Sequence, residues 1–471
     1  MKVINGTYIN GQFTQSNERE VVEIISPLDE SILGTLQYAN VKDTEAAIEA
    51  ANLAFEKYAK TTIEERKTYL QRIHDELLKK VDELVEATIT EYGAPMERAL
   101  WSNKLSAEVF LSYIKVLDEY NFEKKVNEST VIMEPVGVCA LFTPWNATAG
   151  SIAVKVAASL AAGCTVILKP SEFTPWQAEL VMQAIDKAGL PKGVVNMVNG
   201  RGDIIGGVIM ASNKVQKISF TGSTQVGKLL AKQAVDTMKR VTLELSGKSA
   251  NIILEDADLS TAIPMALQAA FMNNGQACIA GSRLLVPENK MDEIEAALLA
   301  AAASFKVGHP RSEGTKIGPL ANKKQFDRIQ SYINIGINEG AKLLYGGPGS
   351  PEGLEKGYYV KPTIFTGVTN QMQIAREEIF GPVLSVIPYR DEDEAVSIAN
   401  DSPYGLLAYV STKDLVHGRK IAAQLKAGRV LLNTLKHDSL APFGGYKESG
   451  IGRENGVFGL EDFLEAKTLI E

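Results

Sequence analysis

The chain has 471 residues, with 49 Lys or Arg against 57 Asp or Glu, and its formal net charge is -8. A chain of this length exceeds what one hydrophobic core serves, so we expect two or three domains. The acidic balance argues against a nucleic acid or an anionic membrane surface as the main partner and leaves small metabolites open.

No apolar stretch approaches the roughly 20 residues that span a bilayer, and the first residues lack the apolar region of a signal peptide. The cysteines at positions 139, 164 and 278 are too widely spaced for a disulfide framework or a metal cluster. Free thiols suit a reducing compartment. We therefore expect a cytoplasmic protein that needs no metal.

The N-terminal third contains one predicted hairpin and several packing helices. Residues 8–13 form the hairpin, with Asn10-Gly11 as its turn. Asp43 is expected to cap the first helix, and apolar spacing over 70–89 predicts further helix. His74 is expected on the charged, solvated face of that helix.

From residue 136 onward, apolar strands alternate with helical stretches. This alternation predicts a Rossmann-like, doubly wound parallel sheet, because parallel neighbours need a crossover that a helix supplies. Cys139 and Cys164 belong to two of these strands and are expected in the core. The predicted strands are 136–142, 164–168, 194–198, 215–220 and 240–245, and the predicted helices are 149–162, 174–188, 201–212 and 224–235.

Polar residues follow four of these strands, at the edge where such sheets bind ligands. Gly222 to Gly227 opens a helix, whose free N–H groups and dipole offer a site for a diphosphate, with Ser223 as a further donor. Lys169 and Glu172 suit ribose hydroxyls. A structural glycine turn and a surface Lys-Glu pair are the alternatives. The loops begin at Thr143-Pro144-Trp145-Asn146, Lys169-Pro170-Ser171-Glu172, Thr221-Gly222-Ser223 and Glu244-Leu245-Ser246-Gly247-Lys248.

Cys278 lies in the loop 275–283, among small and polar residues. A thiol becomes a nucleophile as its thiolate, which polar neighbours and backbone N–H donors favour. The setting indicates a nucleophile, and the alternative is a small buried cysteine without a task. The surrounding alternation of strands and helices predicts a second α/β domain, with strands at 251–254, 282–286, 383–389, 408–411 and 430–432.

These motifs resemble the NAD(P)-dependent aldehyde dehydrogenase superfamily over nearly the whole chain. The resemblance implies a catalytic set in which Cys278 is the nucleophile, Glu244 the general base and Asn146 the oxyanion donor, with Lys169 as a further member. It rests on Pro144-Trp145-Asn146, Lys169-Pro170-Ser171-Glu172, Phe220-Thr221-Gly222-Ser223, Glu244-Leu245-Ser246-Gly247-Lys248, Gly275-Gln276-Ala277-Cys278, Glu377-Glu378-Ile379-Phe380-Gly381-Pro382 and Pro442-Phe443-Gly444-Gly445-Tyr446-Lys447.

The resemblance also implies NAD as the cofactor, with NADP less favoured, and no metal. Lys169 and Glu172 would bind the adenosine ribose, and Ser223 the diphosphate. Glu378 and Phe380 would hold the nicotinamide ribose and ring. The predicted cofactor set is completed by Thr143, Trp145 and Gly222.

The implied reaction oxidises an aldehyde to a carboxylic acid through a thiohemiacetal and a thioester on Cys278. Two residues depart from the family pattern: Ser246 adds a hydroxyl beside the base, and Ala147 removes bulk beside the reacting carbon. A coenzyme A-acylating dehydrogenase is one alternative. A cysteine hydrolase or acyltransferase is another, for which His437 is the one histidine with a plausible place in the site.

The predicted organisation has three parts. Residues 1–117 and 137–246 form the dinucleotide-binding domain, and 247–445 form the catalytic domain. Residues 118–136 and 446–471 supply strands of a small β extension for oligomerisation. In the family such strands pair between subunits, which implies a homodimer or homotetramer.

Overall fold

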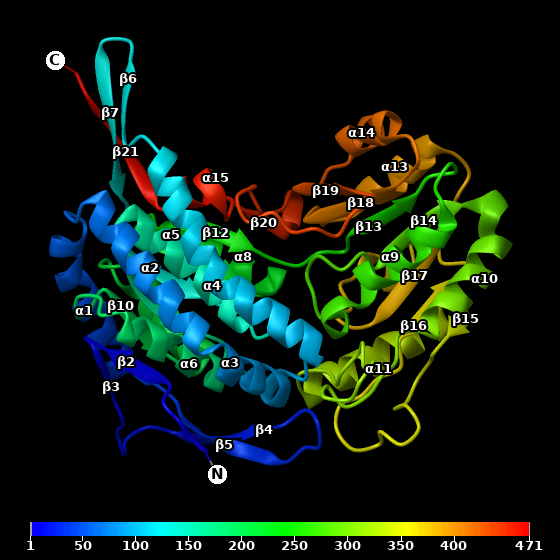
Figure 1. Cartoon of the computed structure of the whole chain (residues 1–471), viewed down its shortest axis with the longest axis horizontal. Helices are drawn as coiled ribbons and strands as arrows, with labels where there is room; N and C mark the ends of the chain where they lie inside the picture. The colour runs from blue at the N-terminus through cyan, green and yellow to red at the C-terminus, as the bar shows by residue number, and fades with distance from the viewer. Residues whose placement is uncertain (1, 471) are drawn as a thin grey trace.

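The structure, a computed structural model, describes residues 2–470. Figure 1 shows two lobes side by side and a narrow β extension that projects from the first lobe. An eight-stranded sheet forms the centre of the first lobe, and a seven-stranded sheet forms the centre of the second. The mixed α/β class with parallel sheets is as the sequence predicts.

The first sheet has the strand order β20-β12-β11-β8-β9-β10-β2-β3. Its five central strands are parallel, and each coincides with a strand predicted from sequence. The chain enters at β8, continues through β9 and β10 on one side, and returns to β11 and β12 on the other. Ligands bind where the strand order reverses in this way, here between β8 and β11. The bounds are β8 (Val138–Phe142), β9 (Thr165–Lys169), β10 (Val195–Val198), β11 (Lys217–Thr221) and β12 (Arg240–Glu244).

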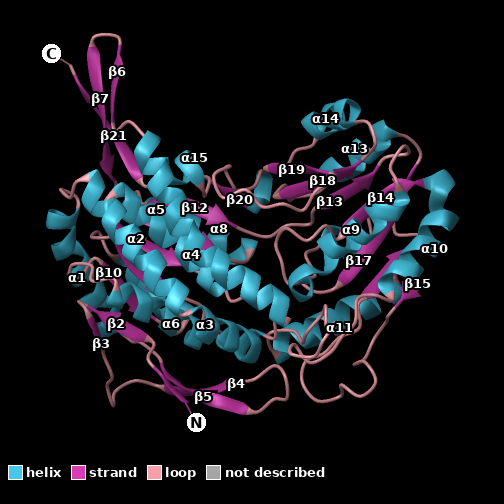
Figure 2. Ribbon diagram, in the orientation of Figure 1, coloured by secondary structure: helices cyan, strands magenta, loops and turns pink. Residues whose placement is uncertain are grey.

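Helices cover both faces of this sheet (Figure 2). Side chains such as Leu141 and Leu168 face α2, α4, α5 and α6, and Ala140 and Ile167 face α1, α7 and α8. The continuous apolar strands follow from this double burial. The bounds are α1 (Val41–Tyr58), α2 (Ile63–Lys79), α3 (Val81–Ala87), α4 (Met96–Glu119), α5 (Thr148–Ala162), α6 (Pro175–Lys187), α7 (Gly202–Ala211) and α8 (Thr224–Ala234), with a π-helical turn at Thr88–Tyr92.

The edges of the first lobe are antiparallel. The predicted hairpin is present, with Asn10 at φ 50° and Gly11 at φ 83°, and it pairs with β10. At the opposite edge β20 pairs with β12. The bounds are β2 (Thr7–Ile9), β3 (Gln12–Phe13) and β20 (Gly450–Ile451), and a separate sheet contains β1 (Lys2–Ile4), β4 (Val21–Ile25) and β5 (Ile32–Gln37).

The second sheet has the order β15-β16-β17-β14-β13-β18-β19, and only β15 is antiparallel. The five strands predicted in this part of the chain are present. The strands are β13 (Ala250–Ile253), β14 (Arg283–Pro287), β15 (Lys342–Tyr345), β16 (Thr363–Thr366), β17 (Val383–Tyr389), β18 (Leu407–Ser411) and β19 (Arg429–Leu432). The helices are α9 (Leu259–Phe271), α10 (Met291–Ala302), α11 (Lys323–Asn338), α12 (Gln373–Arg376), α13 (Glu392–Asn400) and α14 (Leu415–Gln424).

The extension is the antiparallel sheet β21-β7-β6, built from β6 (Glu123–Val126), β7 (Ser129–Pro135) and β21 (Leu464–Leu469). Only the last part of the predicted stretch 446–471 belongs to it. β20 joins the first sheet, and α15 (Gly456–Glu461) packs against α4 and α5. The assignment of 446–463 to the extension is therefore wrong, because these residues complete the first lobe.

Two local expectations in α1 and α2, on Asp43 and His74, need correction. Asn40 caps α1, and Asp43 is the third helical residue, whose carboxylate accepts the N–H of Asn40 in a capping box. His74 is only 8% exposed, and its Nδ1 lies 2.8 Å from the carboxylate of Asp75. Arg66 is also buried, because its guanidinium donates to carbonyls at the end of α5.

The two lobes meet through their backbones. The N–H of Met96 donates to the carbonyl of Pro310 at 3.0 Å. A Cβ on Gly318 would lie 2.0 Å from the carbonyl oxygen of Gly93, so this contact requires glycine. No helix in the part of the chain that the structure describes is both long enough and apolar enough to cross a bilayer.

Candidate active site

The cysteine loop follows α9 and lies against the first lobe. Asn273 and Asn274 adopt left-handed φ values of 56° and 59°, which turn the chain sharply before Gly275. The Asn274 amide donates to the carbonyl of Gly93 at 3.1 Å. Residues 275–278 are thereby fixed between the lobes, and Cys278 is partly exposed.

Gly247 brings three of the motifs together. Its N–H donates to Oε1 of Glu378 at 3.0 Å, and a Cβ at this position would lie 2.1 Å from the carbonyl oxygen of Cys278. A Cβ on Gly275 would similarly lie 2.2 Å from the backbone of Gly381. The segments after β12, around Cys278 and before β17 therefore pack at backbone distance, and only glycine permits this.

Glu244, at the end of β12, is buried, and neither carboxyl oxygen has a hydrogen-bond partner among residues 2–470. Burial raises its pKa well above the usual range, and the neighbouring Glu454 adds to the effect. Lys155 and Arg453 oppose the shift. A Cβ on Gly444 would lie 2.6 Å from Oε1 of Glu244. Glu244 is thus a desolvated carboxyl without a hydrogen-bond partner in the described residues, which is suited to taking up a proton near neutral pH.

The thiol of Cys278 differs from the sequence-based expectation. Burial raises its pKa to about 12, and the charges of Glu378 and Glu244 act in the same direction. The backbone N–H groups of Cys278 and Ile279 lower the pKa, as expected, but they do not outweigh burial. The polar sequence around the thiol therefore does not by itself produce a thiolate. A positive charge near the sulfur would be needed to stabilise one.

Asn146 follows β8 and reaches the cysteine loop. Its Nδ2 donates to the carbonyl of Gln276 at 2.9 Å, and this bond uses one of its two N–H groups. The second can serve a ligand oxygen. Beside it, Ala147 is exposed, and a Cβ on Gly150 would meet no heavy atom within 4 Å. The first turn of α5 therefore leaves open space next to the site.

The residues assigned to the adenosine end lie beyond β9 and β11. Nζ of Lys169 lies 2.9 Å from the carboxylate of Glu172. Ser223 caps α8 by accepting the N–H of Val226, and it is exposed, so its hydroxyl hydrogen remains available. Gly222 leaves no space for a side chain, because a Cβ would lie 2.4 Å from the ring of Phe220. An exposed helix N-terminus with a hydroxyl donor fits a diphosphate.

Further residues assigned to the cofactor lie close together. The hydroxyl of Thr143 is buried without a hydrogen-bond partner in the described residues. Phe380 has φ 66°, which is unusual for a bulky residue, and its ring meets that of Trp145 edge to face at 5.3 Å. Such strain is stored where a site needs it. Burial raises the pKa of Glu378, and a hydrogen bond from the Ser246 hydroxyl opposes this shift, so this hydroxyl serves the neighbouring carboxylate.

Gln276 and Tyr92 are structural residues of the site that the sequence does not single out. Nε2 of Gln276 donates to the hydroxyl of Tyr92 at 3.2 Å, and this hydroxyl donates to the carbonyl of Asn273 at 3.0 Å. Tyr92 belongs to the π-helical turn, whose type is often found at functional sites. Only the position of Tyr92 beside the cysteine loop shows that it supports this loop.

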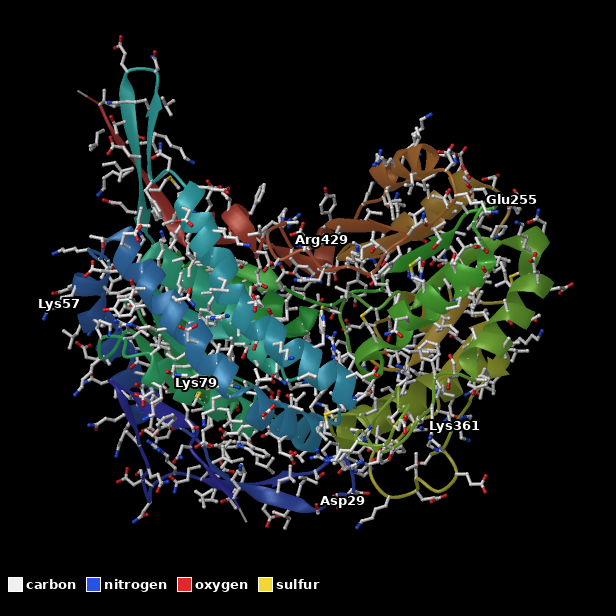
Figure 3. All side chains as sticks on the ribbon, viewed as in Figure 1. Asp29, Lys57, Lys79, Glu255, Lys361 and Arg429 are labelled. Atoms are coloured by element: carbon white, nitrogen blue, oxygen red, sulfur yellow. The ribbon has the colours of Figure 1, made fainter. Side chains whose placement is uncertain are left out.

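The residue His437 is exposed. Partial burial of its ring lowers the pKa of His437, and the charge of the nearby Arg429 acts in the same direction. Figure 3 shows Arg429 between the two lobes. Burial lowers the pKa of Arg429, and the charge of Glu244 opposes this shift, so this loop lies near Glu244.

Comparison with known proteins agrees with this geometry. The model of the aldehyde dehydrogenase family matches residues 13–469. The chain is 45% identical over 465 residues to a putative aldehyde dehydrogenase of Staphylococcus aureus and to 3-succinoylsemialdehyde-pyridine dehydrogenase of a Pseudomonas species, covering 98% of this chain and 98% of each relative.

Solved structures give the same result. Aldehyde dehydrogenase C of Pseudomonas syringae, solved as a mutant with NAD+ and octanal, has a TM-score of 0.97 and 44% identity, covering 99% of this chain and 96% of that one. Betaine aldehyde dehydrogenase of Staphylococcus aureus, solved with NAD+, has a TM-score of 0.96 and 34% identity, covering 99% and 94%. The chain belongs to the aldehyde dehydrogenase family.

Proposed function

We propose that the protein oxidises an aldehyde to a carboxylic acid with NAD, through a thioester on Cys278 that water hydrolyses. Family membership supports aldehyde oxidation, and the NAD complexes of related structures support the cofactor. The observation that carries the hydrolytic step is the buried carboxyl of Glu244, which has no hydrogen-bond partner in the described residues.

The thiol of Cys278 loses its proton to solvent, the sulfur adds to the aldehyde carbon, and the negative charge moves to the aldehyde oxygen. The free N–H of the Asn146 amide and the N–H of Cys278 bind this oxygen, and each such donor is typically worth about a hundred- to a thousand-fold in rate. Bound NAD+ supplies the acceptor for the hydride that leaves the carbon. A thioester on Cys278 remains.

Glu244 then removes a proton from the attacking water, and the sulfur of Cys278 leaves as the acid is released. The raised pKa of Glu244 makes it a better proton acceptor than an ordinary carboxylate. Coenzyme A would replace water as the acceptor in an acylating dehydrogenase. That reaction has no need of a water-activating base, so Glu244 favours hydrolysis.

The cofactor would be held by Thr143, Trp145, Gly222, Ser223, Glu378 and Phe380, with Lys169 and Glu172 at the adenosine ribose. This assignment limits the part of Lys169 in catalysis to positioning the cofactor. Glu172 carries a negative charge that would repel the extra phosphate of NADP. We therefore expect NAD to give the higher catalytic efficiency, and Glu172→Gln to reduce that preference. An unchanged preference would contradict this role.

Rapid mixing of the Glu244→Gln variant with saturating aldehyde and NAD tests the hydrolytic step. Loss of a general base typically costs about a hundred- to ten-thousand-fold, so we expect a burst of about one NADH per active site and then very slow turnover, the pattern of an accumulating acyl-enzyme. Cys278→Ser is the control and should give no burst. Wild-type turnover by Glu244→Gln, or full rescue by coenzyme A, would refute hydrolysis by this base.

A further inference from the structure

Glu91 is a buried acid that the proposed reaction does not use. It lies in the π-helical turn Thr88–Tyr92 and is only 2% exposed. Its Oε1 accepts the N–H of Trp176 at 2.6 Å, and its Oε2 accepts the N–H of Gln177 at 3.1 Å. Burying a carboxyl group costs free energy unless hydrogen bonds compensate, and the bonds that Glu91 makes are to the start of α6.

This carboxyl group replaces the ordinary cap of α6. The N-cap residue Thr174 makes no side-chain hydrogen bond to the free N–H groups of its own helix, and Pro175 has no N–H. Glu91 supplies the missing acceptor from a segment 85 residues away in the chain. Figure 1 shows α3, which precedes the turn, beside α6. One side chain therefore joins the π-helical turn to this helix.

Tyr92, the next residue in the turn, connects it to the cysteine loop. Its hydroxyl accepts from Nε2 of Gln276 at 3.2 Å and donates to the carbonyl of Asn273 at 3.0 Å. Gln276 is fully buried, and its Oε1 accepts the N–H of Ala321 at 3.1 Å. Loss of any of these bonds would leave a buried polar group unsatisfied. The turn therefore fixes the residues that precede Cys278.

The start of α6 makes a second connection, to the loop after β8. The Thr174 hydroxyl, which does not cap α6, lies 2.7 Å from the hydroxyl of Thr148, the first residue of α5. Both residues are buried. The Thr148 hydroxyl donates to the carbonyl of Trp145 at 3.3 Å. The segment that carries Asn146 is thereby fixed to the N-terminus of α6.

We propose that Glu91 is a positioning residue, which holds the loops of Cys278 and Asn146 in the arrangement that the reaction needs by joining the π-helical turn to α6. The two loops also bind each other. Nδ2 of Asn273 donates to the carbonyl of Asn146 at 2.9 Å, and Nδ2 of Asn146 donates to the carbonyl of Gln276 at 2.9 Å. The proposal rests on the function proposed above and adds a residue that lies outside the reacting groups.

Single-turnover experiments test this role, with enzyme in excess over an aldehyde that the wild type oxidises, such as butanal, and with saturating NAD. Glu91→Gln keeps the shape of the side chain but offers one acceptor to two N–H groups. We expect the rate of NADH formation to fall by about tenfold to a hundredfold, because a misplacement of about 1 Å at a reacting centre costs about a hundredfold.

Two further variants interrupt one connection each. Tyr92→Phe removes the hydroxyl that binds the cysteine loop, and Thr174→Val removes the hydroxyl that binds α5. Each should lower the single-turnover rate by less than Glu91→Gln does. The double variant Glu91→Gln/Tyr92→Phe should lose less than the product of the two single losses, because both changes act on the same loop.

Glu179→Gln is the matched control. Glu179 is a buried carboxyl on the same helix, and its Oε1 accepts from Nδ2 of Asn5 at 2.8 Å in the N-terminal segment. Its variant should keep the wild-type single-turnover rate even where its melting temperature falls. This comparison separates positioning of the loops from a general loss of stability.

A wild-type single-turnover rate in Glu91→Gln, a loss that saturating NAD removes, or single losses that simply multiply in the double variant would overturn the proposal. Wild-type rates in both Tyr92→Phe and Thr174→Val would also overturn it, so the test does not depend on the folding of Glu91→Gln. In each case the aldehyde dehydrogenase activity of the wild type stands. Absence of NADH from the wild type with every aldehyde would instead overturn the proposed function.

Discussion

Glu244 combines two properties that conflict in most carboxyl groups, burial and the absence of a hydrogen-bond partner among the described residues. A buried carboxyl favours its protonated form. The native structure therefore holds a proton on Glu244 at pH values where an ordinary glutamate has lost it. The burial that suits Glu244 to catalysis therefore also lowers the free energy of unfolding.

This cost should appear in the pH dependence of stability. Below the ordinary carboxyl pKa, Glu244 is protonated in the folded and unfolded chain alike. As pH rises toward its raised native pKa, only the unfolded chain loses the proton, and the free energy of unfolding falls by up to about 1.4 kcal/mol per pH unit. Glu244→Gln should lack this contribution, so its melting temperature should exceed that of wild type at pH 8 and approach it near pH 4.

Calorimetric scans of both proteins across this range measure the difference. Glu172→Gln is the control, because Glu172 is only partly buried, so its variant should follow wild type. A difference between wild type and Glu244→Gln that is constant from pH 4 to pH 8 would contradict the account given for the pKa of Glu244.

The connection between β12 and β13 is the element that aligns the chemistry. Gly247 lies so close to the carbonyl of Cys278 that an added methyl group must displace backbone. We expect Gly247→Ala to fold but to lose about a hundredfold in kcat, because a misplacement of about 1 Å at a reacting centre costs this much. Steady-state kinetics with a fixed aldehyde and NAD measure the loss.

Gly207→Ala in α7 is the matched substitution, since a Cβ there meets no heavy atom within 4 Å. It should retain full activity and gain up to about 1 kcal/mol of helix stability. Full activity of Gly247→Ala would show that the contact with Cys278 tolerates displacement, and the alignment argument would fail.

The sequence predicts the elements of both sheets well, because strands buried on two faces read as unbroken apolar runs. Prediction from sequence fails where the structure of a segment depends on contacts with residues far away in the chain. Arg66 and His74 lie in a charged stretch, yet tertiary contacts bury both. The stretch 446–463 joins the first lobe through a pairing with β12 that no local pattern encodes.

The same limit applies to the site. The motifs around Asn146, Glu244 and Cys278 are contiguous in sequence, and the structure brings them together. The raised pKa of Cys278 depends on burial and on Glu378, a hundred residues further along the chain.

At the scale of the molecule, apolar side chains are exposed on the segment after α8 and on the β extension. On the segment after α8, Met238 is 84% exposed and Val235 is 67% exposed. In the extension, Val126 and Leu469 are exposed, and the strands β6 and β21 have free edges. Unpaired edges and grouped apolar residues favour association.

We therefore propose a homodimer or homotetramer and expect sedimentation to give at least twice the chain mass. Met238→Asp should weaken the assembly, because a charge would be buried at the interface, whereas Lys79→Asp on the far, exposed face of α2 should not. A wild-type monomer at micromolar concentration, or an unchanged assembly of Met238→Asp, would contradict this interface.

The second lobe is inserted between β12 and β20 of the first, so two crossings connect the lobes, one after Glu244 and one that ends at the motif 442–447. Both crossings contribute to the candidate active site, and Cys278 comes from the inserted lobe. The two lobes are distinct in structure, but the site needs residues from both. A chimera that exchanges one lobe between relatives would inherit half of an active site, and its success would depend on matching the few glycines at the junction.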